Sequence, residues 1–285
     1  MTESFNPDVR ELRRIALKTG ATGFDDAAAA HRVAAVVDVE TTGLNGETDA
    51  IIELAVRRFK FDDGGRILEI GASRCWREDP GVALPEDISR LTGIKDEDLV
   101  GQRIDDDAAV RIIGSADLVI AHNASFDRPL VERRLSALPP KAWACSCREI
   151  DWRGAGFDGR ALGWLCAQAG WFYDAHRADG DVDAVIQLLS HQRSDGVTLL
   201  SELAASAASE SWLIEAIGAD YAVKDALRLR GYRWDPKAQH WWREVFDRDR
   251  LAEEYWLARE IYAPDKRSRA MAPRITRRTA HDRYR

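Results

Sequence analysis

A continuous apolar segment that ends in two acidic residues constrains the fold of this chain more than any other feature. Residues 32–40 read Arg-Val-Ala-Ala-Val-Val-Asp-Val-Glu. Such an uninterrupted, β-branched run is typical of a strand that is buried within a sheet. Side chains two residues apart on a strand project from the same face, so we expect Asp38 and Glu40 to lie side by side.

The acidic pair at the end of this strand suggests a cation site. Two neighbouring carboxylates repel each other unless a cation lies between them. Their oxygen atoms are the ligands that Mg²⁺ and Mn²⁺ prefer. The next residues, Thr41-Thr42-Gly43, are typical of a tight turn with small side chains, which leaves room for a substrate. The pair alone is also compatible with a strand that simply ends in a polar turn.

The order of the following elements indicates the fold class. Two more strands are expected at residues 50–61 and 66–76, separated by the turn Asp62-Asp63-Gly64-Gly65. Short strands at 118–121 and 143–146 then alternate with helices at 105–113, 126–138, 162–169 and 179–193. This order predicts an α/β fold with a mixed five-stranded sheet flanked by helices.

Two later segments carry acidic residues near the start of a predicted helix. Asp127 follows His122-Asn123-Ala124-Ser125-Phe126 and falls in the first helical turn, where a carboxylate also interacts favourably with the helix dipole. Residues 176–184 read His-Arg-Ala-Asp-Gly-Asp-Val-Asp-Ala. Asp179, Asp181 and Asp183 are all candidate ligands there, and residue chemistry alone does not choose among them.

Together these segments resemble the three motifs of the DEDDh (DnaQ-like) 3′–5′ exonucleases. That family includes the exonuclease domain of the DNA polymerase III epsilon subunit, ribonuclease T and oligoribonuclease. Residues 38–43 match D-x-E-T-T-G, residues 122–127 match H-N-x-x-F-D, and residues 176–181 match H-x-A-x-x-D. The motifs occur in the family's order, and the resemblance covers about residues 33–194. It implies a ribonuclease-H-like fold, in agreement with the elements above.

The resemblance also implies a reaction and a set of site residues. The family hydrolyses phosphodiester bonds from the 3′ end of nucleic acid and releases 5′-mononucleotides. Two Mg²⁺ or Mn²⁺ ions would be held by Asp38, Glu40, Asp127 and Asp181. His176 would be the general base, because an imidazole can accept a proton near neutral pH. The residues implied to seat the terminal nucleotide are Thr41, Thr42, Leu44 and Phe126.

Residues 195–263 are expected to form a connector helix and a small α+β module. Their aromatic residues, with Arg interleaved, could stack the bases of a single strand, or could build the core that a small module needs. Trp241 and Trp242 would point to opposite faces of a strand, so at most one would be in the core. The segment resembles a Gly-Tyr-Arg-Trp…Trp-Trp module appended to some bacterial DnaQ-like exonucleases, which implies no particular activity.

The two ends of the chain are expected to lie outside these domains. Residues 1–32 are predicted to be an N-terminal helical extension, since Asn6-Pro7-Asp8 is a helix-start signal. Residues 264–285 contain eight Lys or Arg and two Asp, a net charge of +6, so the total of −7 leaves −13 for residues 1–263. A basic tail with few apolar residues is expected to be disordered, and it could hold a polyanionic substrate.

The sequence also predicts a compartment. The apolar runs are shorter than the ~20 residues needed to cross a bilayer, and the N-terminal residues lack the pattern of a secretory signal. The four cysteines form no CxxC pair, which argues against a zinc site. We therefore expect a cytoplasmic protein with reduced thiols and no membrane association.

Single-stranded nucleic acid is the expected partner, with DNA favoured over RNA and DNA replication or repair proteins as further candidates. An exonuclease that acts alone is favoured over a replicative proofreader, because no clamp-binding peptide is recognisable. An RNA-directed exonuclease of the same fold stays open, since discrimination of the 2′-OH depends on pocket shape. A non-catalytic nucleic-acid-binding adaptor is a further alternative, but it would be expected to lack one or more of the five catalytic residues.

Overall fold

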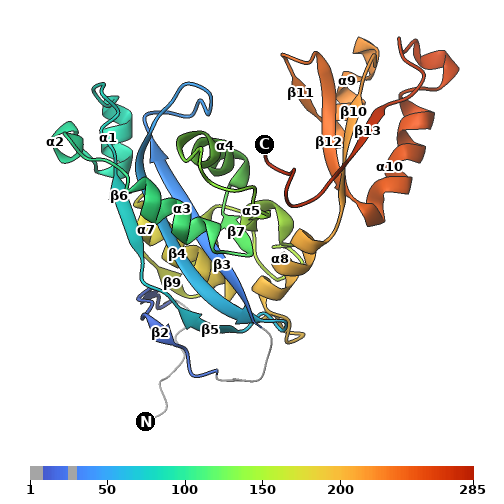
Figure 1. Cartoon of the computed structure of the whole chain (residues 1–285). Helices are drawn as coiled ribbons and strands as arrows, with labels where there is room; N and C mark the ends of the chain where they lie inside the picture. The colour runs from blue at the N-terminus through green and yellow to red at the C-terminus, as the bar shows by residue number, and fades with distance from the viewer. Residues whose placement is uncertain (1–8, 25–30) are drawn as a thin grey trace. The chain divides into compact units, whose positions relative to one another are not determined.

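The structure, a computed structural model, describes residues 9–24 and 31–285 (Figure 1). The chain divides into two compact units. The large unit extends to Ala207 and also includes Tyr284 and Arg285, and the C-terminal unit is Ala208–Arg283.

A mixed sheet forms the centre of the large unit, with the order β2-β5-β4-β3-β7-β8 and β6 paired to β4. The first strand of the sequence analysis is β3 (His31–Thr41), which runs antiparallel to β4 (Ile51–Asp62) and parallel to β7 (Leu118–Ala121). The other strands are β2 (Gly20–Ala21), β5 (Ile67–Ile70), β6 (Arg74–Arg77) and β8 (Trp143–Cys145). The predicted α/β class with a mixed sheet is confirmed.

The described part of this sheet has seven strands where five were predicted. One extra strand arises because the predicted strand 66–76 is divided. The backbone N–H of Gly71 donates to Arg58 at the end of β5, and β6 then pairs with another part of β4, opposite Glu53 to Val56. The other extra strand is β2, which adds to β5.

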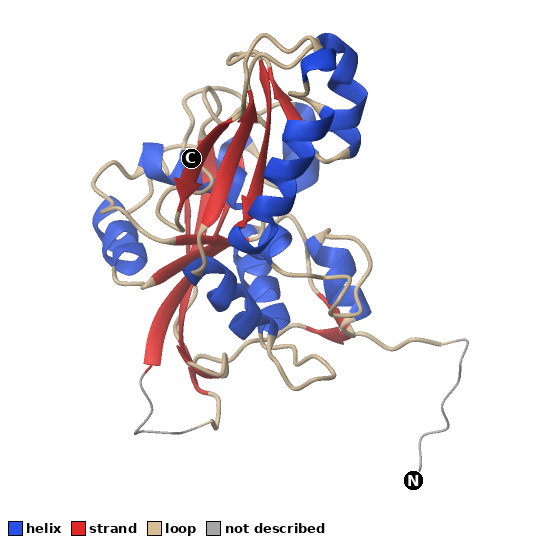
Figure 2. Ribbon diagram, turned by 90° about the vertical axis from the view of Figure 1, so that its right-hand side faces the viewer, coloured by secondary structure: helices blue, strands red, loops and turns tan. Residues whose placement is uncertain are grey.

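Helices pack on both faces of the sheet (Figures 1 and 2). On one face Ala35, Val37 and Val39 of β3 join a buried cluster with side chains of α3 and α4. The alternate side chains of β3 face α7, which packs across β3 and β4. The helices of the large unit are α1 (Glu86–Thr92), α2 (Asp96–Leu99), α3 (Asp106–Gly114), α4 (Ala124–Arg134), α5 (Ser146–Glu149), α6 (Leu162–Gln168), α7 (Ala178–Leu189) and α8 (Leu199–Ala208).

The predicted connector helix is part of the large unit. Leu199, Leu200 and Leu203 of α8 are buried. Glu202 of the same helix accepts a 2.6 Å hydrogen bond from the backbone of Asp151 and pairs with Arg193 at 2.9 Å. The large unit therefore continues past residue 194, the end of the segment that carries the family resemblance.

The predicted N-terminal helix is wrong for the described residues 9–24. β1 (Arg13–Arg14) pairs in parallel with β9 (Trp171–Phe172), and β2 pairs with β5. These extended segments satisfy their backbone groups through hydrogen bonds to neighbouring strands, such as Arg13 N–H to Gly170 at 2.9 Å. The helix-start signal at residues 6–8 lies outside the described residues.

The C-terminal unit is a four-stranded antiparallel sheet with helices α9 and α10. Ile214, Leu227, Val245 and Leu257 are among the side chains of its buried cluster. Its elements are β10 (Ser211–Ala216), the 3₁₀ helix η1 (Tyr221–Val223), α9 (Lys224–Leu229), β11 (Arg233–Asp235), β12 (His240–Phe246), α10 (Asp247–Glu260), the 3₁₀ helix η2 (Pro264–Lys266) and β13 (Arg274–Arg278).

The prediction of a disordered basic tail is wrong. Within residues 264–285, β13 pairs along the length of β10, and Ile275 packs against the buried cluster of the C-terminal unit. The charge of Arg274 is offset by Glu215, and Arg283 is buried, with its guanidinium 2.8 Å from Ser211 Oγ. Acidic partners far away in the sequence therefore order a segment that its own composition marks as disordered.

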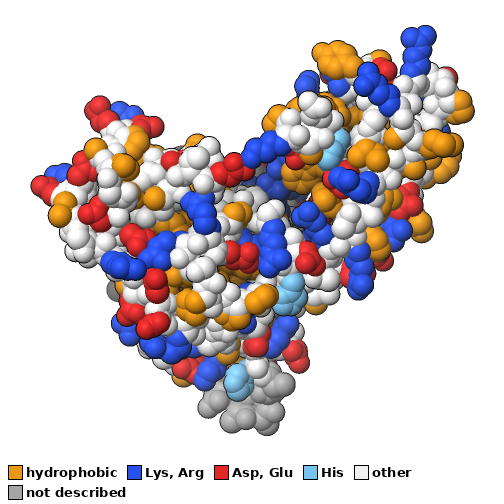
Figure 3. Space-filling model, turned by 45° about the horizontal axis from the view of Figure 1, so that its top comes forward, with side chains coloured by type: hydrophobic (Ala, Val, Ile, Leu, Met, Phe, Trp, Pro, Cys, Tyr) orange, Lys and Arg blue, Asp and Glu red, His pale blue; other side chains and the backbone are white. Residues whose placement is uncertain are grey.

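The aromatic residues of the C-terminal unit divide between core and surface. Trp241 packs against the buried cluster, whereas Trp242 projects from the other face of β12 near the guanidinium of Arg233. Trp234 is 49% exposed and contacts the edge of Trp241. Hydrophobic side chains consequently appear among Lys and Arg on the surface of this unit (Figure 3).

The cysteines carry no disulfide in the described chain, and Cys145 and Cys166 are buried. None of the helices formed by residues 9–24 and 31–285 combines the length and apolar character that spanning a membrane requires.

Gly65 in the β4–β5 turn tests how tightly α8 packs on the sheet. Its φ of +75° is left-handed, and a Cβ at this position would overlap Thr198 Oγ1 and lie 2.6 Å from the Ser201 nitrogen. Gly81 has a similar φ of +71° but open space around it. We expect Gly81→Ala to lower the free energy of unfolding by about 1 kcal/mol, and Gly65→Ala by roughly 3 kcal/mol or more. Equal losses in chemical denaturation would contradict this packing.

Candidate active site

The carboxyl end of β3 places two acidic side chains on the face that α7 covers. Asp38 and Glu40 are two residues apart, and in the sheet they lie opposite Ala55 and Glu53 of β4. The strand upstream of them, Ala34–Val37, is completely buried. The apolar strand therefore fixes the backbone of both acidic residues in the interior of the large unit.

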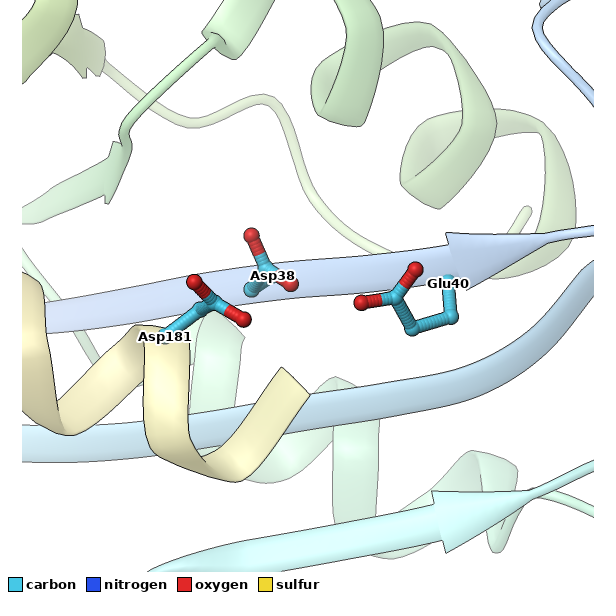
Figure 4. Close-up of side chains that lie close together, drawn as sticks. All are labelled: Asp38, Glu40 and Asp181. Carbon is cyan, nitrogen blue, oxygen red and sulfur yellow. The ribbon is translucent and has the colours of Figure 1, made fainter. Parts of the chain in front are cut away.

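Helix α7 brings a third carboxylate to this pair. Asp181 lies in the first turn of α7, and one oxygen from each of Asp38, Glu40 and Asp181 lies within 4.8 Å of the others. Figure 4 shows the two strand residues beside the helical one. The Tyr173 hydroxyl donates a 2.7 Å hydrogen bond to Asp181 Oδ1 and so holds this carboxylate in place.

Asp127 approaches the same region from the first turn of α4 and is 3% exposed. It does not join the three oxygens within 4.8 Å. Its charge nevertheless acts on both strand residues, because it contributes to the raised pKa of Asp38 and of Glu40. Hydrogen bonds from its own backbone and from that of Val39 fix the carboxylate and link α4 to β3.

Burial disfavours the charged forms of all four groups. Burial is the main cause in each case, and the neighbouring carboxylates add to it for Asp38, Glu40 and Asp127. The pKa of Glu40 is raised to about 7, that of Asp127 to about 7, and that of Asp38 well above its usual value. The pKa of Asp181 is also raised, although Tyr173 and His176 oppose the shift. A bound cation would favour the ionised forms of all four.

His176 lies in the loop that precedes α7 and has a left-handed backbone, with φ of 64°. Its side chain is exposed. A backbone hydrogen bond from His176 and the charge of its ring both stabilise ionised Asp181. The imidazole is therefore close enough to Asp181 to favour its ionised form, and it is open to solvent, as proton transfer to or from a water molecule requires.

The structure separates the three aspartates of the third motif. Asp181 joins the cluster, whereas Asp183 accepts two hydrogen bonds from the Arg57 guanidinium of β4, at 2.7 and 2.8 Å. Asp179 is exposed, and its Oδ1 accepts a hydrogen bond from the backbone of Gly180. Of the three aspartates, Asp181 is the one whose carboxylate lies with those of Asp38 and Glu40.

The four residues assigned to the terminal nucleotide have different surroundings. The Thr41 hydroxyl donates to the carbonyl of Gly43, and the Thr42 hydroxyl donates to Asp49 at 3.0 Å, so both shape the turn after β3. Leu44 is 88% exposed on the same loop. Phe126 packs against the buried cluster beneath α4. Only Leu44 of these four presents a large, freely exposed apolar side chain.

Two residues near the carboxylates were missed in the sequence analysis. Tyr173 holds Asp181, as described above. Glu53 is completely buried on β4, beside Glu40, and its charge raises the pKa of Asp38 and of Glu40. A charged residue within the apolar run Ile51-Ile52-Glu53-Leu54 was the signal available for Glu53, because a buried acid needs specific partners.

Comparison with known proteins places these residues in a family. The family model described as RNase_T exonuclease matches residues 35–189. Ribonuclease T of Shewanella oneidensis is 32% identical over 114 residues, which are 35% of this chain and 51% of that protein. Ribonuclease T of Shewanella sp. (strain ANA-3) is 28% identical over 184 residues, 55% of this chain and 79% of that protein. This chain thus spans about half the length of the first relative.

One further relative and two solved structures are also similar to parts of this chain. The PolC-type DNA polymerase III of Clostridium perfringens is 36% identical over 103 residues, 35% of this chain and 7% of the polymerase. Exonuclease X in complex with 5′ overhanging duplex DNA is 19% identical, with a TM-score of 0.42, over 59% of this chain and 99% of that one. A structure of exonuclease I is 16% identical, with a TM-score of 0.48, over 88% of this chain and 63% of that one.

The match to the family model decides the classification. It covers more than half of the chain, and the matched residues include the four carboxylates and His176. The mixed sheet of this chain, flanked by helices, agrees with the ribonuclease-H-like fold implied by the sequence motifs. The chain therefore belongs to the RNase_T family of exonucleases, which are metal-dependent hydrolases.

Proposed function

We propose that this protein is a 3′–5′ exonuclease that acts on single-stranded nucleic acid, DNA in preference to RNA, and releases 5′-mononucleotides. The observation that carries the proposal is the convergence of Asp38, Glu40 and Asp181, with Asp127 close enough to repel them. A role in cytoplasmic DNA repair, independent of a replicative polymerase, is part of the proposal.

The donor set suits divalent cations such as Mg²⁺ and Mn²⁺, and we propose two of them per site. Carboxylate oxygens are the ligands these ions prefer, and the charge of such ions would offset the repulsion and burial that raise the pKa of all four acids. Asp38, Glu40, Asp127 and Asp181 would hold the ions. When bound, the ions would supply the positive charge that stabilises a phosphoryl-transfer transition state and its leaving oxygen.

Residues of the chain would carry out proton transfer, orient a metal ligand and contact the terminal nucleotide. His176 would accept a proton from the attacking water, and the neighbouring Asp181 would stabilise the imidazolium that forms. Tyr173 would keep the Asp181 carboxylate oriented through its 2.7 Å hydrogen bond. Leu44 would contact the terminal base, while Thr41, Thr42 and Phe126 would shape the pocket around it.

A second candidate is an exonuclease directed at RNA. The observation that favours it is the similarity to two proteins named ribonuclease T. The proposed catalytic residues would be the same, and the candidates differ only in the contacts made to the sugar.

The central test compares the two substrates directly. Wild-type protein should degrade single-stranded DNA stepwise from the 3′ end with Mg²⁺ or Mn²⁺ and should be inactive with EDTA. Asp181→Asn should abolish activity because it removes a metal ligand. Asp179→Asn is the matched control from the same motif and should stay active, since Asp179 lies outside the cluster. Substrates labelled at the 5′ end show the direction of degradation. The mononucleotides released from the 3′ end carry no label and are identified by mass.

The outcome on RNA of the same sequence separates the two candidates. Faster degradation of RNA would favour the second candidate. If neither substrate is degraded with either ion, or if Asp181→Asn retains full activity, the proposed function is wrong.

His176→Ala should lower kcat by about 10²–10⁴-fold, the usual contribution of a positioned general base. The Mg²⁺ concentration required for half-maximal activity should change little, because His176 is not assigned as a ligand. Steady-state rates at several Mg²⁺ concentrations measure both quantities. A parallel loss of turnover and metal affinity would instead make His176 a ligand.

The raised pKa values predict an unusual pH dependence for the metal-free protein. The pKa of Glu40 is about 7 in the folded state against 4.5 ordinarily, and that of Asp127 is about 7 against 3.8. The folded state therefore binds these protons more tightly than the unfolded state. This contribution to stability is present below about pH 4 and is lost as the pH rises through 7, by roughly 3–4 kcal/mol for each group.

Thermal unfolding in EDTA at pH 5 and pH 8 measures this loss. Glu40→Gln should reduce the decrease in Tm, because the variant lacks one of the titrating groups. Saturating Mg²⁺ should stabilise the wild type more at pH 8 than at pH 5, because the carboxylate ligands are ionised at pH 8. An identical pH dependence in wild type and Glu40→Gln would show that this carboxylate is not destabilised by its surroundings.

A further inference from the structure

Glu53 is a completely buried carboxylate next to the proposed metal ligands. It lies on β4 directly opposite Glu40 of β3. An acid in such a place is costly unless cations and hydrogen-bond donors surround it. The groups around Glu53 therefore indicate what it does.

The two carboxylate oxygens of Glu53 connect three segments of the chain. Oε2 accepts a 3.1 Å hydrogen bond from the backbone N–H of Ala178, the first residue of α7. Oε1 lies 3.3 Å from Arg77 Nε of β6 and 3.5 Å from a terminal nitrogen of Arg177. One buried side chain thus ties β4 and β6 to the start of α7.

The residue just before these contacts is His176. Its side chain is exposed, so packing does not hold the ring, and its left-handed backbone is uncommon for a residue other than glycine. Asp181 holds His176 through a backbone hydrogen bond on one side. On the other side, the next two residues, Arg177 and Ala178, are both bound to Glu53.

We propose that Glu53 is a positioning residue for His176: it fixes the loop before α7 so that the imidazole stays beside the metal-binding carboxylates. The proposal rests on the proposed function, because Glu53 acts through the assigned general base. Glu53 is not assigned as a metal ligand, since both of its oxygens are engaged by the partners above.

Proton transfer is fast only when the donor and acceptor atoms are correctly placed, so a displaced His176 should slow the reaction. A shift of about 1 Å in a catalytic group can cost on the order of 10²-fold in rate. Glu53→Gln keeps an acceptor for Ala178 but removes the charge that holds Arg77 and Arg177. It should lower kcat by about 10- to 100-fold, with KM changed by less than about 2-fold when Mg²⁺ is saturating.

A double-mutant cycle with His176→Ala separates positioning from a general structural role. If Glu53 acts through His176, Glu53→Gln should lower kcat by less than about 2-fold in the His176→Ala background, because the group it positions is already absent. Equal reductions in both backgrounds would overturn the proposal. So would an unchanged kcat in folded Glu53→Gln at saturating Mg²⁺.

Two further variants serve as a control and as a replacement in case Glu53→Gln does not fold. Glu253→Gln is the matched control, because Glu253 is a buried carboxylate that pairs with two arginines, Arg230 and Arg243, in the C-terminal unit. It should leave kcat unchanged. If Glu53→Gln does not fold, Arg177→Gln enters the same cycle, since the Arg177 side chain is 43% exposed and its loss should be tolerated. Equal reductions by Arg177→Gln in both backgrounds, or no reduction at all, would then overturn the proposal.

The double-mutant cycle also distinguishes a failure of the proposed function from a failure of the role proposed for Glu53. A His176→Ala variant with wild-type kcat would remove the general base from the proposed function, whatever Glu53→Gln does. A large effect of His176→Ala together with additive effects of Glu53→Gln would leave the proposed function intact and reject only the role of Glu53.

Discussion

The repulsion among partly and fully buried carboxylates at the end of β3 is the constraint on which the rest of the large unit depends. Asp38 and Glu40 are carried into the interior by the apolar strand before them, and α4 and α7 add Asp127 and Asp181. Such an arrangement opposes folding in the absence of a cation. The extensive pairing of β3 with β4 and β7, and the packing of α7 across them, are the interactions that offset this cost.

Arginine–carboxylate pairs give α7 its position over the acidic residues. The buried Arg57 of β4 holds Asp183 with two short hydrogen bonds, and Glu53 of the same strand binds the first backbone N–H of the helix. Asp181 lies between these two attachment points in the sequence. The third motif thus combines a site residue with one that secures the helix, although both are aspartates two positions apart.

The elements around the acidic residues could be predicted because each has a strong local signal. The apolar run of β3, the strand of β7 and the periodic pattern of α7 are properties of contiguous residues, and period two alone put Asp38 and Glu40 on one face. Whether Asp181 or Asp183 joins them depends on Arg57, which is more than a hundred residues away. Propensity also misjudged β1, β2 and β13, since short extended segments owe their stability to partners distant in the sequence.

The strand β13 follows the other three strands of the small sheet in the sequence, and this order has a consequence for biosynthesis. Its partner β10 lies in the interior of the small sheet, between β12 and β13, and about 60 residues separate the two strands. Until the ribosome has made residues 274–278, β10 has an open edge with unpaired backbone groups, and open edges promote association between chains. The small sheet is thus not complete before residues 274–278 have been made, and chains that end before Arg274 leave the edge of β10 open to association.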